Sequence, residues 1–306
     1  MISLSAIQTI FVILSAVILF VFSLQGFSKE VQRSGEERLK LWLQRATDSR
    51  LKGFTLGALF TGVLQSSSAV SAMTVALVNA QTIPLYNSFS ILLGTNLGTT
   101  TTAWMVSFKL TGIGPYFIVL GALLGFLPNQ YRIIGKSIFY LGFIFLCLNL
   151  ISDSVSPFQN NPLVLDFLKG NSIIVNILGG LLVTALVQSS SVVTGLAVLL
   201  TQQGVLSIES ALAIILGSNV GTTATALIAG YSMGGNAKIC AKANLIFNLS
   251  GVLLVLLIFP FYSSLITYIA TTPEQSVAFG HLFLNLIIAV VFLAALKPVS
   301  KLLIKD

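Results

Sequence analysis

Long apolar stretches follow one another along this 306-residue chain, which is 55% hydrophobic and only 8% charged. A helix needs about 20 apolar residues to cross a hydrocarbon core of about 30 Å, and a soluble domain carries about 25% charged residues. The sequence therefore predicts an all-α polytopic protein of the cell (inner or plasma) membrane. We expect crossing helices at residues 4–27, 84–108, 110–127, 133–151, 207–230, 243–269 and 277–296.

Two further stretches, residues 53–80 and 176–203, are apolar at both ends and carry the tetrad Gln-Ser-Ser-Ser in the middle. Each arm has about 12 residues, or about 18 Å of helix, so each stretch is predicted to be a re-entrant hairpin that reaches the midplane. If each hairpin returns to the side of the membrane from which it enters, all 16 basic residues except Lys109 and Lys169 lie on one face. The positive-inside rule then places the N-terminus outside and the C-terminus in the cytoplasm.

An internal repeat organises the chain, because Gln65 and Gln188 lie 123 positions apart, as do Asn96 and Asn219. The tetrads occupy residues 65–68 and 188–191, and the motif Gly-Thr/Ser-Asn-x-Gly-Thr-Thr occupies residues 94–100 and 217–223. Each copy holds three crossings, an odd number, so the second copy is expected to be inverted in the membrane. We divide the chain into a first inverted repeat at 1–128, a second at 129–270 and an extra C-terminal transmembrane helix at 271–306.

The polar motifs predict where the chemistry lies. Their paired glycines predict an interrupted transmembrane helix in each copy, with an unwound middle, and polar backbone at the midplane is tolerated only where it lines a cavity or is buried in protein. Helix N-termini and hydroxyls bind tetrahedral oxyanions, whereas carbonyl and hydroxyl oxygens suit a small hard cation. We therefore expect a cage without fixed charge, where an anion and a cation lower each other's burial cost.

The coupling ion is constrained by the nine acidic residues, all of which map to connectors, helix ends or the terminus. Proton relays usually need an intramembrane carboxylate or histidine, and the single histidine, His281, lies near the start of the last predicted helix. Sodium is therefore favoured over protons, and no other cofactor is expected. The basic residues lie in the gaps between apolar runs, so no nucleic-acid partner is predicted, and the connector 29–52 is predicted to be a surface-lying amphipathic helix.

With its duplicated Gln-Ser-Ser-Ser motifs the sequence resembles the sodium-dependent phosphate cotransporter family, the type II sodium/phosphate symporters and their bacterial relatives. The resemblance covers essentially the whole chain and implies import of inorganic phosphate with sodium by alternating access, not an enzyme; a homodimer is a possible assembly. It implies phosphate binding by Gln65, Ser66, Ser67, Ser68, Gln188, Ser189, Ser190 and Ser191. It implies sodium binding by Gln65, Ser68, Thr95, Asn96, Thr99, Thr100, Gln188, Ser191, Ser218, Asn219, Thr222 and Thr223.

Three other functions stay open at this point. The first is a sodium-coupled carrier of another small anion such as sulfate. Against it, monohydrogen phosphate has a proton to donate to a carboxamide oxygen of Gln65 or Gln188, and sulfate has none. An intramembrane serine hydrolase would need a positioned base, and His281 is expected near a membrane face while the serines lie at the midplane. A channel would lack sodium dependence and slow, saturable flux.

Overall fold

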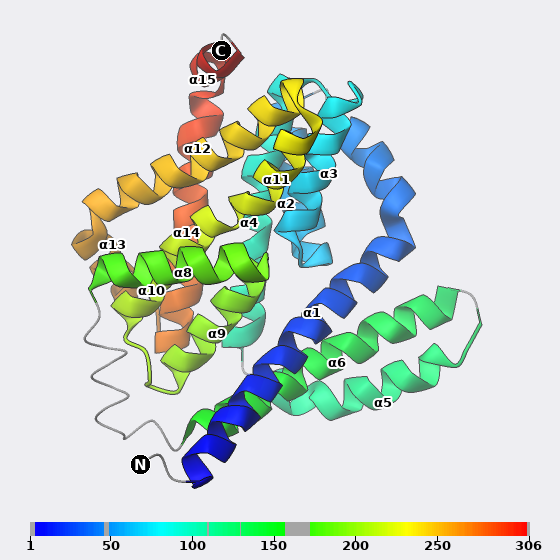
Figure 1. Cartoon of the computed structure of the whole chain (residues 1–306), viewed down its shortest axis with the longest axis vertical. Coiled ribbons are helices and arrows are strands. Elements are labelled where there is room, and N and C mark those ends of the chain that lie inside the picture. Colours follow the sequence, from blue (N-terminus) through cyan, green and yellow to red (C-terminus); the bar gives the residue numbers. More distant parts are fainter. Residues whose placement is uncertain (1–3, 46–48, 109, 129, 157–171, 305–306) are drawn as a thin grey trace.

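The computed structural model describes residues 4–45, 49–108, 110–128, 130–156 and 172–304, and this part of the chain consists of helices and turns without a β-strand (Figure 1). Within it, five helical segments are long and apolar enough to cross a membrane: Gln8–Arg33, Tyr131–Val155, Ile208–Met233, Gly235–Leu257 and Pro273–Ala294. The predicted class, an all-α polytopic membrane protein, is confirmed.

The first half of the chain forms α1 (Leu4–Arg45), α2 (Arg50–Leu64), α3 (Ser67–Asn79), α4 (Leu85–Ser107), the 3-10 turn η2 (Leu110–Ile113) and α5 (Gly114–Gly125). Residues 29–45 of the predicted amphipathic helix at 29–52 are helical, but they continue α1, which runs unbroken for 42 residues; residues 46–48 lie outside the described part, and residues 50–52 begin α2. Lys, Glu, Gln, Arg and Leu dominate the C-terminal part of α1, and these are strong helix formers. The expected crossing at 110–127 is instead a 3-10 turn followed by the 12-residue α5.

The second half forms α6 (Gln130–Val155), α8 (Ile173–Val187), α9 (Ser190–Gln202), α10 (Ile208–Gly221), α11 (Thr223–Met233), α12 (Gly235–Leu257), α13 (Phe259–Ile269), α14 (Pro273–Ala294) and α15 (Leu296–Ile304). The expected single crossing at 243–269 is wrong, because it divides at Ile258 into α12 and α13. Pro260 lies two residues later, in the first turn of α13. Its ring lacks an N–H and would clash with a carbonyl one turn earlier, so one straight helix cannot continue through it.

The glycine motifs produce no unwound segment, contrary to expectation, although the second motif contains the boundary between α10, which ends at Gly221, and α11, which begins at Thr223. Helix α4 runs through residues 94–100 without a break, and Thr222, between α10 and α11, keeps helical angles of φ −59° and ψ −27°. The glycines serve close packing instead. A Cβ on Gly94 would lie 1.9 Å from the carbonyl oxygen of Phe54, and one on Gly217 would lie 1.8 Å from that of Ile177. Only glycine therefore lets these helices touch backbone to backbone, as in other small-residue membrane interfaces.

The two copies share this packing position by position. The pairs α2/α8 and α3/α9 begin and end at residues 123 positions apart. The first arm of each hairpin has its own close approach as well, since a Cβ on Gly57 would lie 2.2 Å from the Ile91 oxygen and one on Gly180 would lie 2.1 Å from the Ile214 oxygen. Equivalent residues thus make equivalent contacts in both hairpins.

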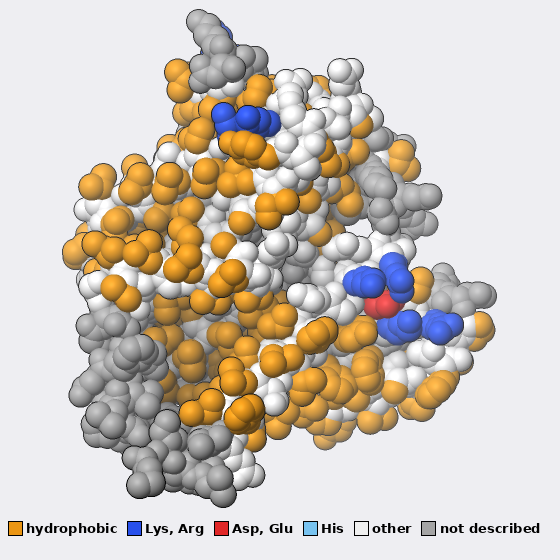
Figure 2. Space-filling view, in the orientation of Figure 1, with side chains coloured by type: hydrophobic (Ala, Val, Ile, Leu, Met, Phe, Trp, Pro, Cys, Tyr) orange, Lys and Arg blue, Asp and Glu red, His pale blue; other side chains and the backbone are white. Residues whose placement is uncertain are grey.

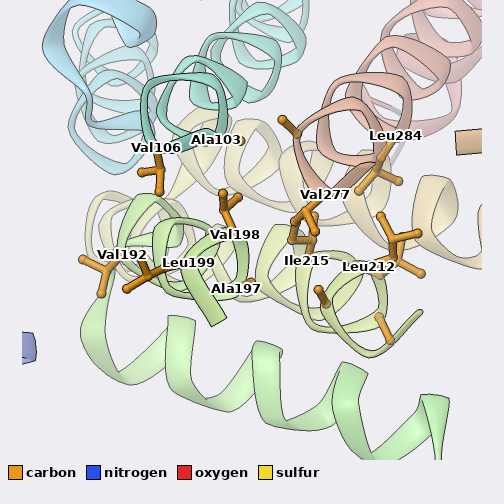
Figure 3. Close-up of a cluster of buried hydrophobic side chains, with 14 of the residues drawn as sticks. Ala103, Val106, Val192, Ala197, Val198, Leu199, Leu212, Ile215, Val277 and Leu284 are labelled. Carbon is orange, nitrogen blue, oxygen red and sulfur yellow. The ribbon is translucent and has the colours of Figure 1, made fainter. Parts of the chain in front are cut away.

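The core lies where the two copies interlock. The second arm α9 packs against α4 of the first copy, where Val192 and Val198 lie near Ala103 and Val106, and α10 and α14 complete this apolar cluster (Figure 3). In the reciprocal arrangement, α3 packs against α11 and α12 of the second copy. Helices α1, α5 and α6 pack on one another beside these helices, and buried residues of α1 and α6, such as Phe20 and Leu148, belong to the same apolar cluster (Figure 1). The crossing of arms brings the two hairpin tips together.

Candidate functional site

Both hairpins turn at the glutamine of their tetrad. Gln65 has φ 53° and ψ 29°, Gln188 has φ 55° and ψ 29°, and each donates its backbone N–H to the threonine carbonyl four residues earlier, at 2.8 and 2.7 Å. A left-handed residue other than glycine costs roughly 1–2 kcal/mol, and such strain concentrates at functional sites. The following serine, Ser66 or Ser189, is extended and precedes the next helix. The turn therefore directs the N-termini of α3 and α9 toward the tip.

The tips face a common cavity of about 300 Å³. All eight predicted phosphate-binding residues line it, and α1 supplies one wall. The remaining lining residues are Leu24, Gln25, Ser28, Lys29, Gln32, Leu186 and Val187. The structure thus brings together two tetrads that are far apart in the sequence.

The expected cage without fixed charge needs correction, because Lys29 of α1 lines this cavity. The neighbouring Glu30 is buried, does not line the cavity and belongs to an ion-pair cluster, 3.4 Å from Arg33 and 3.8 Å from Lys136 of α6. Figure 2 shows basic side chains gathered around an acidic one where α1 and α6 meet. Glu30 thus lies within a continuous helix and not in a connector, while Lys29 gives the cavity a positive charge.

Direct hydrogen bonds join the two tips. The Ser68 hydroxyl donates to the backbone carbonyl of Gln188 at 2.9 Å. From α4, the Thr102 hydroxyl donates to Gln65 Oε1 at 2.5 Å and lies 3.1 Å from the Ser191 hydroxyl. The Gln65 amide group also donates to the Gly62 carbonyl. One carboxamide, that of Gln65, is therefore fixed in place, whereas Gln188 is exposed to the cavity.

The predicted sodium ligands outside the tetrads do not line the cavity; they lie buried behind it. Asn96 and Asn219 meet at Asn248 of α12, to which their side-chain amides donate at 3.1 and 2.7 Å. The hydroxyl groups of the motif threonines donate to carbonyls of their own helices, at distances between 2.7 and 3.2 Å; these residues are Thr95, Thr99, Thr100, Thr222 and Thr223. Ser218 accepts from the Thr184 hydroxyl at 2.8 Å.

Some buried hydroxyls have no hydrogen-bond partner among the described residues. Ser190 is one of them and lines the cavity; Thr61 and Thr194 lie in the two hairpins, and Thr225 occupies the second-copy position equivalent to Thr102. Leaving such a group unpaired costs about 1–3 kcal/mol. Orphaned hydroxyls around the tips therefore mark a region suited to polar ligands. His281, buried on α14, does not line this cavity.

Three residues of the site were missed by sequence reasoning. Lys29 was assigned to the cytoplasmic membrane face, and Thr102 ends the run of threonines from which only two were selected. Asn248 lies in an expected crossing helix of the second repeat, outside the repeated motifs. A signal existed for Asn248, because Asn244 and Asn248 stand one helical turn apart in an otherwise apolar segment, and polar residues inside membrane helices mark functional sites.

Several apolar helices enclosing a polar cavity between two hairpin tips define a multi-pass membrane transporter. Comparison with known proteins specifies the class further. The family described as Na+/Pi-cotransporter matches residues 19–153 and 164–294. The chain therefore belongs to the Na+/Pi-cotransporter family, as its resemblance predicted.

Individual relatives are similar over different shares of their length. The uncharacterized protein YqeW of Bacillus subtilis (strain 168) is 34% identical over 84% of this chain and 84% of its own length. The putative inorganic phosphate export protein YjbB of Escherichia coli (strain K12) is 28% identical over 96% of this chain, which spans only 55% of that relative. The sodium-dependent phosphate transport protein 2A of Rattus norvegicus is 32% identical over 43% of this chain and 19% of its own length. No solved structure matches.

Proposed function

We propose that this chain is a sodium-coupled symporter that imports inorganic phosphate by alternating access. The observation that carries the proposal is the cavity shared by both Gln-Ser-Ser-Ser tips and Lys29. Family membership supports phosphate as the substrate and sodium as the coupling ion.

Phosphate is bound in this proposal by the two tetrads. The N-termini of α3 and α9 supply backbone N–H groups that have no partner within their helices, and each helix end carries roughly half a positive charge. Lys29 adds a full charge at the wall of the cavity. Together these roughly two positive charges balance monohydrogen phosphate, while the serine hydroxyls, Ser190 above all, bind its oxygens.

Sodium is bound in this proposal by oxygens of the motif helices and the tips. A threonine hydroxyl that donates its proton to its own helix presents only lone pairs to a neighbour, as Thr95, Thr99 and Thr222 do. Such oxygens suit a hard cation. The described residues that line the cavity include no acidic side chain, so a sodium ion there would depend on the bound phosphate for its negative partner, which couples the movement of the two ions.

The membrane arrangement belongs to the same proposal. Residues 1–128 and 129–270 form repeats of opposite orientation, residues 271–306 add a helix, and the N-terminus lies outside. The recurrence of the Gly57 and Gly180 contacts supports the duplication. In this arrangement the hairpins enter from opposite faces as re-entrant segments. A movement that exposes first one hairpin and then the other to its own side of the membrane opens the cavity to each side in turn.

Import is the direction expected where sodium enters down its gradient, because a symporter moves its substrate along with the ion. The Escherichia coli relative carries a name that says export, so the direction of transport is an outcome of the test. Purified protein in liposomes is supplied with radiolabelled phosphate under an inward sodium gradient, then under a potassium or proton gradient. Uptake that requires sodium and saturates with phosphate is the expected result; equal uptake under all gradients would refute sodium coupling.

The site assignment has its own test. Ser67→Ala or Ser190→Ala removes a hydroxyl bond to a charged ligand, worth about 1.5–3 kcal/mol, so the KM for phosphate should rise at least tenfold. Ser71→Ala is the matched control, because Ser71 is also buried on α3 but does not line the cavity. Wild-type KM values in both site variants would refute the assignment.

Anion competition addresses the substrate. Arsenate, which carries the same ionisable proton as phosphate, should compete for uptake, and sulfate should not. The exposed carboxamide of Gln188 is the proposed acceptor of that proton, since the Gln65 oxygen already accepts from Thr102. Equal competition by sulfate would favour a carrier of other small anions.

A further inference from the structure

We propose that Asn248 is a positioning residue for cation binding, which holds Asn96 and Asn219 so that one carboxamide oxygen from each copy is left to bind a cation. The inference rests on the proposed function for the identity of this cation as sodium. The four residues Asn96, Asn219, Asn244 and Asn248 are called the carboxamide hub below.

Asn248 lies at the centre of the hub. Its Oδ1 accepts from Asn96 Nδ2 at 3.1 Å and from Asn219 Nδ2 at 2.7 Å. Its own Nδ2 donates to the Asn244 backbone carbonyl at 2.8 Å and lies 3.2 Å from Asn244 Oδ1. A single side chain on α12 therefore connects the asparagine of the repeat motif on α4 with the asparagine at the same motif position on α10.

The hydrogen-bond pattern fixes the direction of each amide. A carboxamide oxygen only accepts and its nitrogen only donates. Turning Asn248 around would set its NH2 group against two other NH2 groups and its oxygen against two oxygens of Asn244. Asn96 and Asn219 must therefore present nitrogen to the hub, which leaves both of their oxygens directed away from Asn248. Oxygens of this kind are the ligands that hard cations prefer.

Burial makes this arrangement rigid. The exposed fractions of the four residues are 4% for Asn96, 5% for Asn219, 1% for Asn244 and 0% for Asn248. Away from water a hydrogen bond is stronger and an unpaired amide is costly, so neither motif amide can rotate without a penalty of about 1–3 kcal/mol. The oxygens are thus preorganised before any ion arrives.

The hub exists only once in this duplicated chain. The first-copy positions equivalent to Asn244 and Asn248 are Gly121 and Gly125, 123 residues earlier. Helix α5, which carries them, packs against α6, where a Cβ on Gly121 would lie 2.3 Å from the Phe139 nitrogen. Helix α12 instead contacts both α4 and α10. Asn248, which has no counterpart in the first copy, therefore orients the equivalent asparagines of both copies. In this proposal it couples the cation ligands of the two copies.

The test compares Asn248→Leu and Asn248→Asp in proteoliposomes. Leucine has the same branching and number of side-chain heavy atoms as asparagine but no acceptor, so the sodium concentration for half-maximal uptake should rise at least tenfold, while the KM for phosphate at saturating sodium changes less than threefold. A protonated, neutral aspartic acid keeps one carbonyl oxygen that accepts from both amides and a hydroxyl that donates to the Asn244 carbonyl, so its sodium dependence should stay within threefold of wild type. Asn285→Leu is the matched control, because Asn285 is equally buried and donates to the His281 carbonyl on its own helix.

A purely structural role predicts different results. It would lower the melting temperature and the maximal rate of both leucine variants and leave the half-saturating sodium concentration unchanged. That outcome, or an equal shift of sodium dependence in Asn285→Leu, would overturn the inference. If Asn248→Leu does not fold, a tenfold change in the half-saturating sodium concentration of Asn248→Asp would also overturn the inference.

A binding measurement separates this inference from the proposed function. The melting temperature of purified protein is followed against sodium concentration without phosphate, and Asn248→Leu should need at least tenfold more sodium for the same stabilisation. Sodium stabilisation of the wild type without phosphate uptake would refute the phosphate proposal and leave the hub standing. A wild type that responds to sodium in neither assay would refute both.

Discussion

Two adjacent glycines in α8 offer a direct test of the packing that holds each hairpin on its motif helix. Gly180 faces α10, and a Cβ there would lie 2.1 Å from the Ile214 oxygen and 2.9 Å from its carbonyl carbon. Gly179 is exposed, and a Cβ there would meet nothing within 4 Å. We therefore expect Gly180→Ala to damage the protein and Gly179→Ala to be harmless.

The magnitude follows from the clash. The new methyl group of Gly180→Ala would sit more than an ångström inside ordinary contact distance of a backbone atom that cannot rotate away, so α8 and α10 must separate. Overpacking of this kind costs about 1–3 kcal/mol, which corresponds to a fall of about 2–12 °C in melting temperature. Both alanines gain up to about 1 kcal/mol of helix propensity, so the difference between the two variants isolates the clash.

Thermal unfolding in detergent and phosphate uptake in liposomes provide the assay. Separation of α8 from α10 also stretches the 2.8 Å bond from Thr184 to Ser218, so Gly180→Ala should lose uptake along with stability. Equal melting temperatures for the two variants would refute the backbone-to-backbone contact. A large loss in Gly179→Ala would show that α8 packs through a different face.

Three further predictions concern charge and polar contacts near the cavity. Lys29→Gln should raise the KM for phosphate about 5- to 30-fold, from about 1–2 kcal/mol of lost attraction, and an unchanged KM would remove Lys29 from the site. Thr102→Val leaves Gln65 Oε1 without its donor and should raise that KM about fivefold or more, whereas the neighbouring Thr101→Val control should match wild type. Glu30→Gln should lower the melting temperature by only a few degrees, because its basic partners are 57% and 41% exposed and exposed pairs are worth at most about 1 kcal/mol; the loss should shrink in high salt.

Hydropathy and the repeated tetrads predicted much of the fold, because both are local properties of the chain. The stretches at 53–80 and 176–203 became the helix pairs α2–α3 and α8–α9, which turn at Gln65 and Gln188. The equivalent hairpin arms begin and end 123 positions apart, as the motif spacing indicated. The membrane class and the family follow from the same signals.

The errors arose where one residue type serves two purposes. Glycine in a helix permits either unwinding or close approach, and Gly94 and Gly217 take the second role because α2 and α8 lie against them. Pro260 stands in an apolar run long enough to cross a membrane, yet it divides that run into α12 and α13. Composition alone cannot distinguish these outcomes, since the neighbour or the local geometry decides them.

The sequence by itself determined the class, the duplicated units and the eight tetrad residues that line the cavity. Tertiary structure decided that Lys29 joins them, that Thr102 holds Gln65 near Ser191, and that Asn248 gathers the asparagines of both copies. The physical reason is that hydropathy and motif chemistry are carried by each segment alone. A binding site is made by contacts between segments far apart in the chain, and those depend on how the helices cross.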